Sequence, residues 1–155
     1  MARVPLREAA YEAIKARLVE ALDGVAVERN RRSLVTGGEG DLLVLRDGGQ
    51  NPNPGAVGED HFVMDAVLEG YVEADDEEVG AELSALYGRA AEALAGPEAL
   101  PIPLGDGLTE IILREGTLEI DIATVTQSET AVAAFYLDLS FDLRVPFGTR
   151  FLVIP

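Results

Sequence analysis

Apolar positions along the chain follow two different spacings. Over residues 5–22 and again over residues 76–95, apolar side chains recur every three or four positions, with charged residues between them. This spacing places the apolar residues on one face of an amphipathic helix. The pattern therefore predicts two helices, the first beginning near Pro5 and the second ending at Gly96.

Elsewhere the spacing changes to two. Strict alternation of apolar and polar residues over 62–72, 118–122 and 131–145 predicts β-strands with one buried face. Shorter apolar runs at residues 25–27, 42–45 and 108–113 predict further strands. We therefore expect a single α+β domain over residues 1–155. Its sheet is expected to be mainly antiparallel, with a mixed sheet as the alternative, and two helices should pack on one face.

Two segments lie outside this pattern. Residues 48–60 are rich in Gly, Pro and Asn, which predicts a flexible loop too long for a tight turn. The C-terminal tail, residues 146–155, is apolar and has no obvious partner strand. We expect it either to close an edge of the sheet or to reach a neighbouring subunit, with Phe151, Leu152 and Ile154 as candidate interface residues.

Composition excludes several classes of function. The chain has 155 residues, 48% of them hydrophobic, which is enough for a real core, and it contains no cysteine. No apolar run approaches the roughly 20 residues needed to span a bilayer, and the N-terminus lacks the apolar core of a signal peptide. A formal net charge of −16 opposes binding to nucleic acid or to anionic lipid.

Candidate chemistry is sparse. His61 is the only histidine, and no phosphate-binding glycine motif is present, so we expect no enzymatic activity and no cofactor. The alternating strands place carboxylates on their polar face, which we expect to be solvated or to repel something negative. A divalent cation site is the alternative. The residues of this expected acidic face are Asp65, Glu69, Glu119, Asp121, Asp138 and Asp142.

Basic residues are few, so the cluster of Arg29, Arg31 and Arg32 is unusual in this chain. Arginine engages carboxylates through two parallel hydrogen bonds, which favours it at contacts between subunits. An exposed arginine turn meeting the acidic face of another copy would be a head-to-tail contact that can close into a ring. The alternative is a turn that is simply solvated.

The order of these motifs resembles a known family. The sequence VAVERN at residues 25–30 follows the first helix, and LLVLRDG at 42–48 precedes a strand, a helix and a long final strand. This arrangement is similar to the tail terminator proteins of long-tailed phages and gene transfer agents, including the minor tail protein U type. The resemblance covers most of the chain, but not residues 48–60 or the C-terminal tail.

The resemblance implies a structural virion protein. Copies would form a ring, hexameric in the family, on the head-proximal end of the tail tube, where the ring stops polymerisation and meets the head connector or adaptor protein. It also implies assembly in the host bacterial cytoplasm, no membrane contact, and passage of DNA through the lumen without specific binding. Alternatives are a head-tail adaptor or neck protein, an acidic metal-binding enzyme, and an inhibitor that mimics nucleic acid.

Overall fold

The computed structural model describes residues 1–35, 38–75, 77–124 and 130–155. Its helices are α1 (Leu6–Ala21) and α2 (Val79–Ala95). The strands are β1 (Ala2–Pro5), β2 (Ala26–Arg29), β3 (Leu42–Asn53), β4 (Glu59–Asp75), β5 (Ile102–Pro103), β6 (Glu110–Ile111), β7 (Leu113–Thr124), β8 (Thr130–Pro146) and β9 (Phe151–Ile154).

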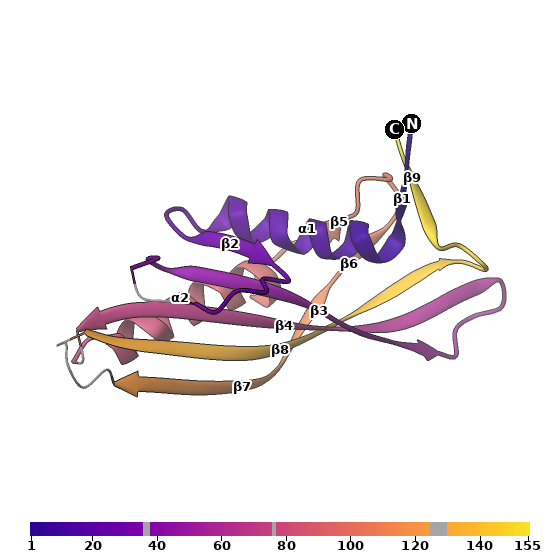
Figure 1. Ribbon diagram of the computed structural model, residues 1–155. Coiled ribbons are helices and arrows are strands. Elements are labelled where there is room, and N and C mark those ends of the chain that lie inside the picture. Colours follow the sequence, from indigo (N-terminus) through magenta and orange to yellow (C-terminus); the bar gives the residue numbers. More distant parts are fainter. Residues whose placement is uncertain (36–37, 76, 125–129) are drawn as a thin grey trace.

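A five-stranded sheet in the order β2-β3-β4-β8-β7 forms the body of the molecule (Figure 1). Its centre is the antiparallel pair of β4 and β8, which stay in register from Glu59 opposite Pro146 to Asp75 opposite Thr130. Both helices pack on one face, where their apolar stripes join the inward residues of the strands in one core. The predicted α+β domain with two helices on one face of the sheet is confirmed.

The alternation in β8 is confirmed along its whole apolar series, because Phe135, Leu137, Leu139, Phe141, Leu143 and Val145 are all buried. In β4 the same face contains Gly70, directly opposite Phe135. A Cβ atom at Gly70 would overlap three atoms of the Phe135 ring. Glycine is therefore required here by the close approach of an aromatic side chain.

The helix ends differ slightly from the prediction. Helix α1 starts at Leu6, and Pro5 precedes it as the last residue of β1 instead of lying in the first turn. Helix α2 starts at Val79, and the predicted start at residue 76 lies outside the described residues. The end of α2 at Ala95, followed by Gly96, is as predicted.

The predicted loop over residues 48–60 is too long, since only residues 54–58 lie outside strands. Strand β3 continues to Asn53 and β4 begins at Glu59, so the connection is short. The ladder passes a bulge between Asp47 and Gln50, and Pro52 lies opposite Phe62. Pro52 is tolerated because β2 pairs only as far as Leu45, so this part of β3 is an edge of the sheet where no N–H donor is needed.

Strands β2 and β3 are parallel, which makes the sheet mixed. A parallel pair cannot be joined by a tight hairpin, so the two strands are linked by a crossover connection. Arg46, on the face opposite the helices, donates to the carbonyl oxygen of Arg31 in this connection at 2.7 Å. Leu42 and Val44 lie on that same face yet are buried. The helix-free face is thus covered in part and open to water elsewhere.

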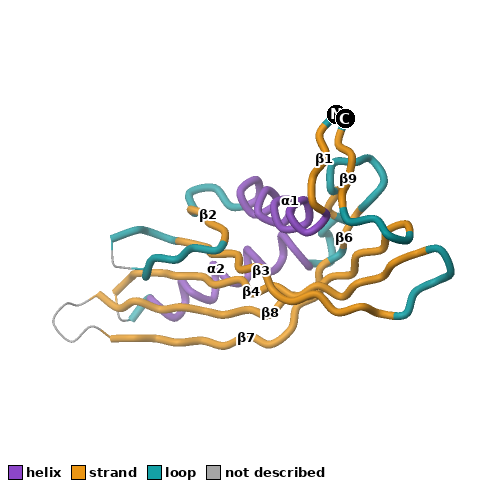
Figure 2. The backbone as a smooth tube through the Cα atoms, turned by 45° about the vertical axis from the view of Figure 1, so that its right-hand side comes forward, coloured by secondary structure: helices purple, strands orange, loops and turns teal. Residues whose placement is uncertain are grey.

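The C-terminal tail closes no edge of the main sheet. Strand β9 pairs antiparallel with β1, with Ala2 opposite Ile154 and Pro5 opposite Phe151. We call β1 and β9 together the arm. Figure 2 shows the arm standing away from the main sheet beside the start of α1, with both termini at its tip. One side of the arm packs on the body, where Leu152 is buried.

Candidate functional site

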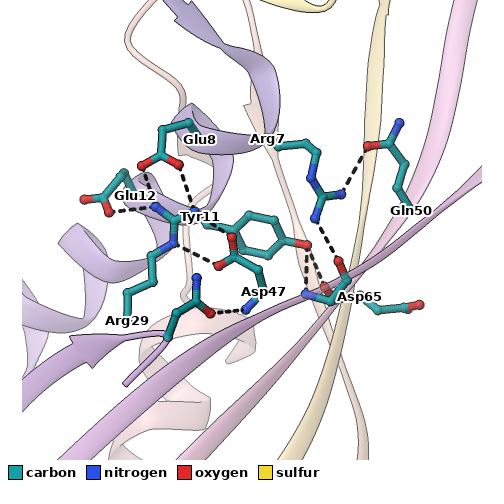
Figure 3. A network of polar contacts seen from close by, with 10 residues as sticks. Arg7, Glu8, Tyr11, Glu12, Arg29, Asp47, Gln50 and Asp65 are labelled. Atoms are coloured by element: carbon teal, nitrogen blue, oxygen red, sulfur yellow. Dashed lines mark hydrogen bonds and ion pairs between the residues drawn. The ribbon is translucent and has the colours of Figure 1, made fainter. Parts of the chain in front are cut away.

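The two motifs behind the family resemblance meet in one polar junction (Figure 3). Arg29 at the end of β2 donates two hydrogen bonds to Asp47 of β3, at 2.8 and 2.6 Å. The same guanidinium donates to Glu8 at 2.6 and 3.0 Å and to Glu12 at 2.8 Å, both on α1. One cation therefore ties the helix to two strands through three carboxylates.

The backbone of the junction is held just as closely. Asn30, with φ of 52°, lies in the left-handed region, which asparagine tolerates better than most residues. Its N–H donates to the carbonyl of Leu45 at 2.8 Å, and its side-chain oxygen accepts the N–H of Asp47 at 2.9 Å. The V-E-R-N and L-R-D-G motifs thus bind each other across the parallel pair.

Helix α1 adds a second set of contacts at the bulge of β3. The Tyr11 hydroxyl donates to the carbonyl of Asp65 at 2.6 Å and accepts the Gly48 N–H at 3.4 Å. Arg7 donates to the Gly48 carbonyl at 2.8 Å and to Gln50 at 3.2 Å. These bonds satisfy backbone groups that the bulge leaves unpaired in the ladder.

The electrostatics of the junction follow from this geometry. The hydrogen bonds that Arg29 donates to Asp47, and then to Glu8 and Glu12, raise the pKa of its guanidinium above its ordinary value. The hydrogen bond from Arg29 lowers the pKa of Glu8. Burial raises the pKa of the Tyr11 hydroxyl. All three shifts move the pKa further from neutral pH, as suits a structural contact and not proton transfer.

We expected the three arginines to form one exposed cluster, and they do not. The Arg29 side chain is only 11% exposed, and Arg31 forms ion pairs with Glu28 at 3.1 Å and Glu39 at 2.8 Å. Arg32 is exposed. Of the three interface candidates, Arg32 alone presents its side chain outward, and the other two serve contacts within the chain.

Four carboxylates of the expected acidic face are exposed, namely Asp65, Glu119, Asp121 and Asp138. The strand register keeps them apart, since Glu119 lies opposite Tyr136 and Asp121 opposite Ala134. Asp138 lies opposite Val67 and Asp65 opposite Ser140. No carboxylate of this set directly faces another across a ladder, so the expected repulsion between neighbouring strands is reduced.

The other two residues of the set are paired. Glu69 is buried, accepts hydrogen bonds from Arg46, and accepts one from the Tyr71 hydroxyl at 2.5 Å. Burial, and then the hydrogen bond to Glu69, raises the pKa of Tyr71. Glu69 is thus part of a closed ion pair and does not contribute open negative surface.

Asp142 accepts a hydrogen bond from Arg114 at 2.6 Å and lies 3.0 Å from the Nε2 atom of His61. The hydrogen bond from Arg114 lowers the pKa of Asp142, and the contact with His61 adds to that effect. His61 is 8% exposed, so the single histidine of the chain is a packed residue of the sheet.

The described residues contain no group of three His, Asp or Glu side chains placed to hold a metal ion. A depression of about 810 Å³ lies between α1, α2 and the segment after α2. Arg17 lies at its wall, but its guanidinium is already engaged within the chain, because it donates to the backbone carbonyls of Leu100 and Pro101. Within the described chain, no helix is long and apolar enough to cross a membrane.

The three C-terminal interface candidates differ in what they present. Phe151 is 41% exposed, with Arg3 stacked at 4.3 Å from its ring centre. Leu152 is buried in the core, and Ile154 is half-buried. Leu152 therefore holds the arm to its own chain, and Phe151 is the one that faces outward.

Sequence reasoning missed the partners of Arg29, although one signal was present. Val25, Val27 and Arg29 share one face of a strand by period two, so an arginine at that position should point toward the helix and need acidic partners there. Glu8 and Glu12, one helical turn apart, supply them. The spacing of Glu8 and Glu12 was visible, but the distance to Asp47 was not.

No protein-family model matches the chain, and no curated protein matches its sequence.

Proposed function

We propose that this protein is a structural ring component of a phage or gene transfer agent tail, of the tail terminator class. Copies assemble on the head-proximal end of the tail tube, stop its polymerisation, and present the opposite ring face to the head connector. The ring is expected to be a hexamer in the assembled virion, with DNA passing through its lumen.

The observation that carries the proposal is the junction around Arg29. The two motifs that resemble the family occupy neighbouring strands and are bound to each other and to the first helix by Arg29, Asn30 and Asp47. Short motifs that a family shares because they hold its fold together are expected to contact each other in the folded chain, as these two do. The Arg29 side chain is only 11% exposed and its two bonds to Asp47 are partly buried within the chain, which favours a shared architecture over shared chemistry.

Charge supports the same role. A protein with a net charge of −16 repels DNA, so a wall built from its copies lets DNA slide past without adsorption. The exposed residues Asp65, Asp138, Glu119 and Asp121 lie on strands β4, β8 and β7 of one face, which makes that face the candidate lining of the lumen. An acidic sheet that faces the lumen would let DNA pass without any contact specific to its bases.

The test adds the purified protein to polymerising tail-tube protein from the same particle. We expect light scattering to show a ring, or a monomer that becomes a ring on the tube. Electron microscopy should then show tubes of arrested length with the protein at one end. The matched control is the same chain added after the tubes have been capped by a native tail end, where no further binding is expected.

The outcome that contradicts the proposal is a monomer that leaves tube length unchanged. Binding to the head connector but not to growing tubes would assign the protein to the adaptor class instead. Stoichiometric binding of Ca²⁺ or Mg²⁺, lost in the Asp138→Asn variant, would favour the metal-binding alternative.

A further inference from the structure

Large apolar side chains are exposed on strands at two places in the described structure. Ile120 and Ile122 of β7 are 53% and 48% exposed, and Phe151 and Val153 of β9 are 41% and 53% exposed. An exposed apolar strand is an unfavourable surface for a soluble monomer, and it marks a place where another chain pairs or packs.

The first place is the outer edge of the sheet. Ile120 lies opposite Phe135 and Ile122 opposite Ala133, so both point to the helix-covered face. They remain exposed because β7 is the last strand of the sheet, and within the described chain no strand pairs with its outer side. We call Leu118, Ile120 and Ile122 the β7 ledge.

The second place is the arm. Phe151 lies opposite Pro5 and Val153 opposite Arg3, so these residues share the side of the arm that faces away from the body. The spacing of Phe151 and Val153 along β9 equals that of Ile120 and Ile122 along β7. Two apolar side chains on each strand can therefore meet side by side.

Charge complements this match. Arg3 is the only charged side chain of β1 and β9, and these strands contain no Asp or Glu although the chain has 28 acidic residues. Strand β7 carries Glu115, Glu119 and Asp121 against Arg114 alone. Glu119 and Asp121 point to the helix-free face, but Glu115 lies on the side of Ile120 and Ile122, where Tyr87 of α2 donates to it. The positive, apolar arm is thus complementary to a side of β7 that carries apolar residues and a carboxylate.

The opposite edge of the sheet is a poorer partner for β7. There β2 has only four residues, and the free part of β3 has a bulge after Asp47 and a proline at position 52. Arg7 also occupies the Gly48 carbonyl. These features block edge pairing, which leaves the arm as the better match among the described elements.

We propose that the arm of one copy packs along the β7 ledge of a second copy, with Phe151 and Val153 covering Ile120 and Ile122. Arm and ledge lie at different ends of the molecule (Figures 1 and 2), so the contact is head-to-tail and can close into a ring. This inference rests on the proposed function, because it names the contact by which the ring would form.

The absence of cysteine from the chain makes a disulfide test clean. The Ile120→Cys and Val153→Cys variants are prepared separately, mixed, and oxidised. We expect a covalent dimer to form about tenfold faster than in a mixture of Ile120→Cys with Val19→Cys, because docking raises the effective concentration of the paired thiols. Val19 is a matched control, since it is 54% exposed but lies on α1.

A second variant tests the contact without cross-linking. Ile120→Arg combined with Ile122→Arg changes only exposed side chains, so circular dichroism should match the wild type, while light scattering should show the mass of a single 16.5 kDa chain. Equal cross-linking in both mixtures, or a ring that survives the double substitution, would overturn the inference and leave the proposed function standing. A wild-type chain that never self-associates, with or without tube protein, would overturn both.

Discussion

Replacing Arg29 by methionine tests the junction that binds α1 to β2 and β3. Arg29 donates five hydrogen bonds, two to Asp47, two to Glu8 and one to Glu12. Methionine keeps an apolar stem that can pack near the Tyr11 ring, whose centre lies 5.6 Å from the guanidinium carbon. The substitution therefore removes the charge and the hydrogen bonds with little loss of packing.

The size of the effect follows from exposure. Glu8 and Glu12 are each 51% exposed, so each pair contributes only about 0.5 kcal/mol. Asp47 is 23% exposed and held by two parallel bonds, which are together worth about 2 kcal/mol. We expect Arg29→Met to lower the free energy of unfolding by about 3 kcal/mol, and Tm by roughly 6–12 °C for a chain of this size.

The assay is urea unfolding followed by circular dichroism at several protein concentrations, with Arg89→Met as the control. Arg89 is exposed and donates only a long hydrogen bond, 3.4 Å, to the Asp23 carbonyl, so its loss should cost less than about 0.5 kcal/mol. A deficit below about 1 kcal/mol for Arg29→Met would mean that desolvation cancels the hydrogen bonds. A deficit that grows with protein concentration would mean that Arg29 acts between copies, which would refute the intrachain account.

Three further predictions concern the rest of the fold. Gly70→Ala should destabilise by about 1–3 kcal/mol because its Cβ overlaps the buried Phe135 ring, whereas Gly88→Ala in α2, where a Cβ has open space, should stabilise by roughly 0.5–1 kcal/mol; thermal melts compare the two, and equal effects would contradict the packing argument. Tyr11→Phe should cost about 1–2 kcal/mol in urea unfolding, since it removes the hydrogen bond to the Asp65 carbonyl, and a neutral result would mean that water replaces the hydroxyl. The Arg150 ion pair and the Gly148 N–H lower the pKa of Asp60. The contribution of ionised Asp60 to folding stability is therefore present above an unfolded pKa of about 3.9 and is lost as pH falls through the lower folded value. The stability difference between wild type and Asp60→Asn should be largest at neutral pH and shrink at about pH 3, and a constant difference would contradict the shift.

Periodicity determined the main elements of this protein. The apolar stripe of residues 6–21 and the long alternation ending at Val145 depend on neighbours one to four positions away, so the sequence alone predicts the two helices, the strands β4 and β8, and which of their faces is buried. The same local rule explains why the prediction for residues 48–60 differs from the structure. Gly, Pro and Asn favour loops locally, yet β4 supplies a ladder that β3 can continue along.

Strand pairing was decided only in the folded chain. Whether β2 and β3 run parallel, whether β9 joins the main sheet or β1, and which strand is left at the edge all depend on contacts between residues far apart in sequence. The exposure of Ile120 and Ile122 is a case in point, since their alternation matches that of buried strands and only the place of β7 at the edge uncovers them.

The roles of the charged residues divide in the same way. The sequence determined the net charge of −16, because net charge is a sum over composition. Which charges are open and which are paired depends on distances of a few ångströms, since an ion pair forms only when both groups reach one another in the fold. Arg29 was expected outside as a contact for another copy, but it binds α1, β2 and β3 to one another within the chain. Arg3 on the arm faces outward.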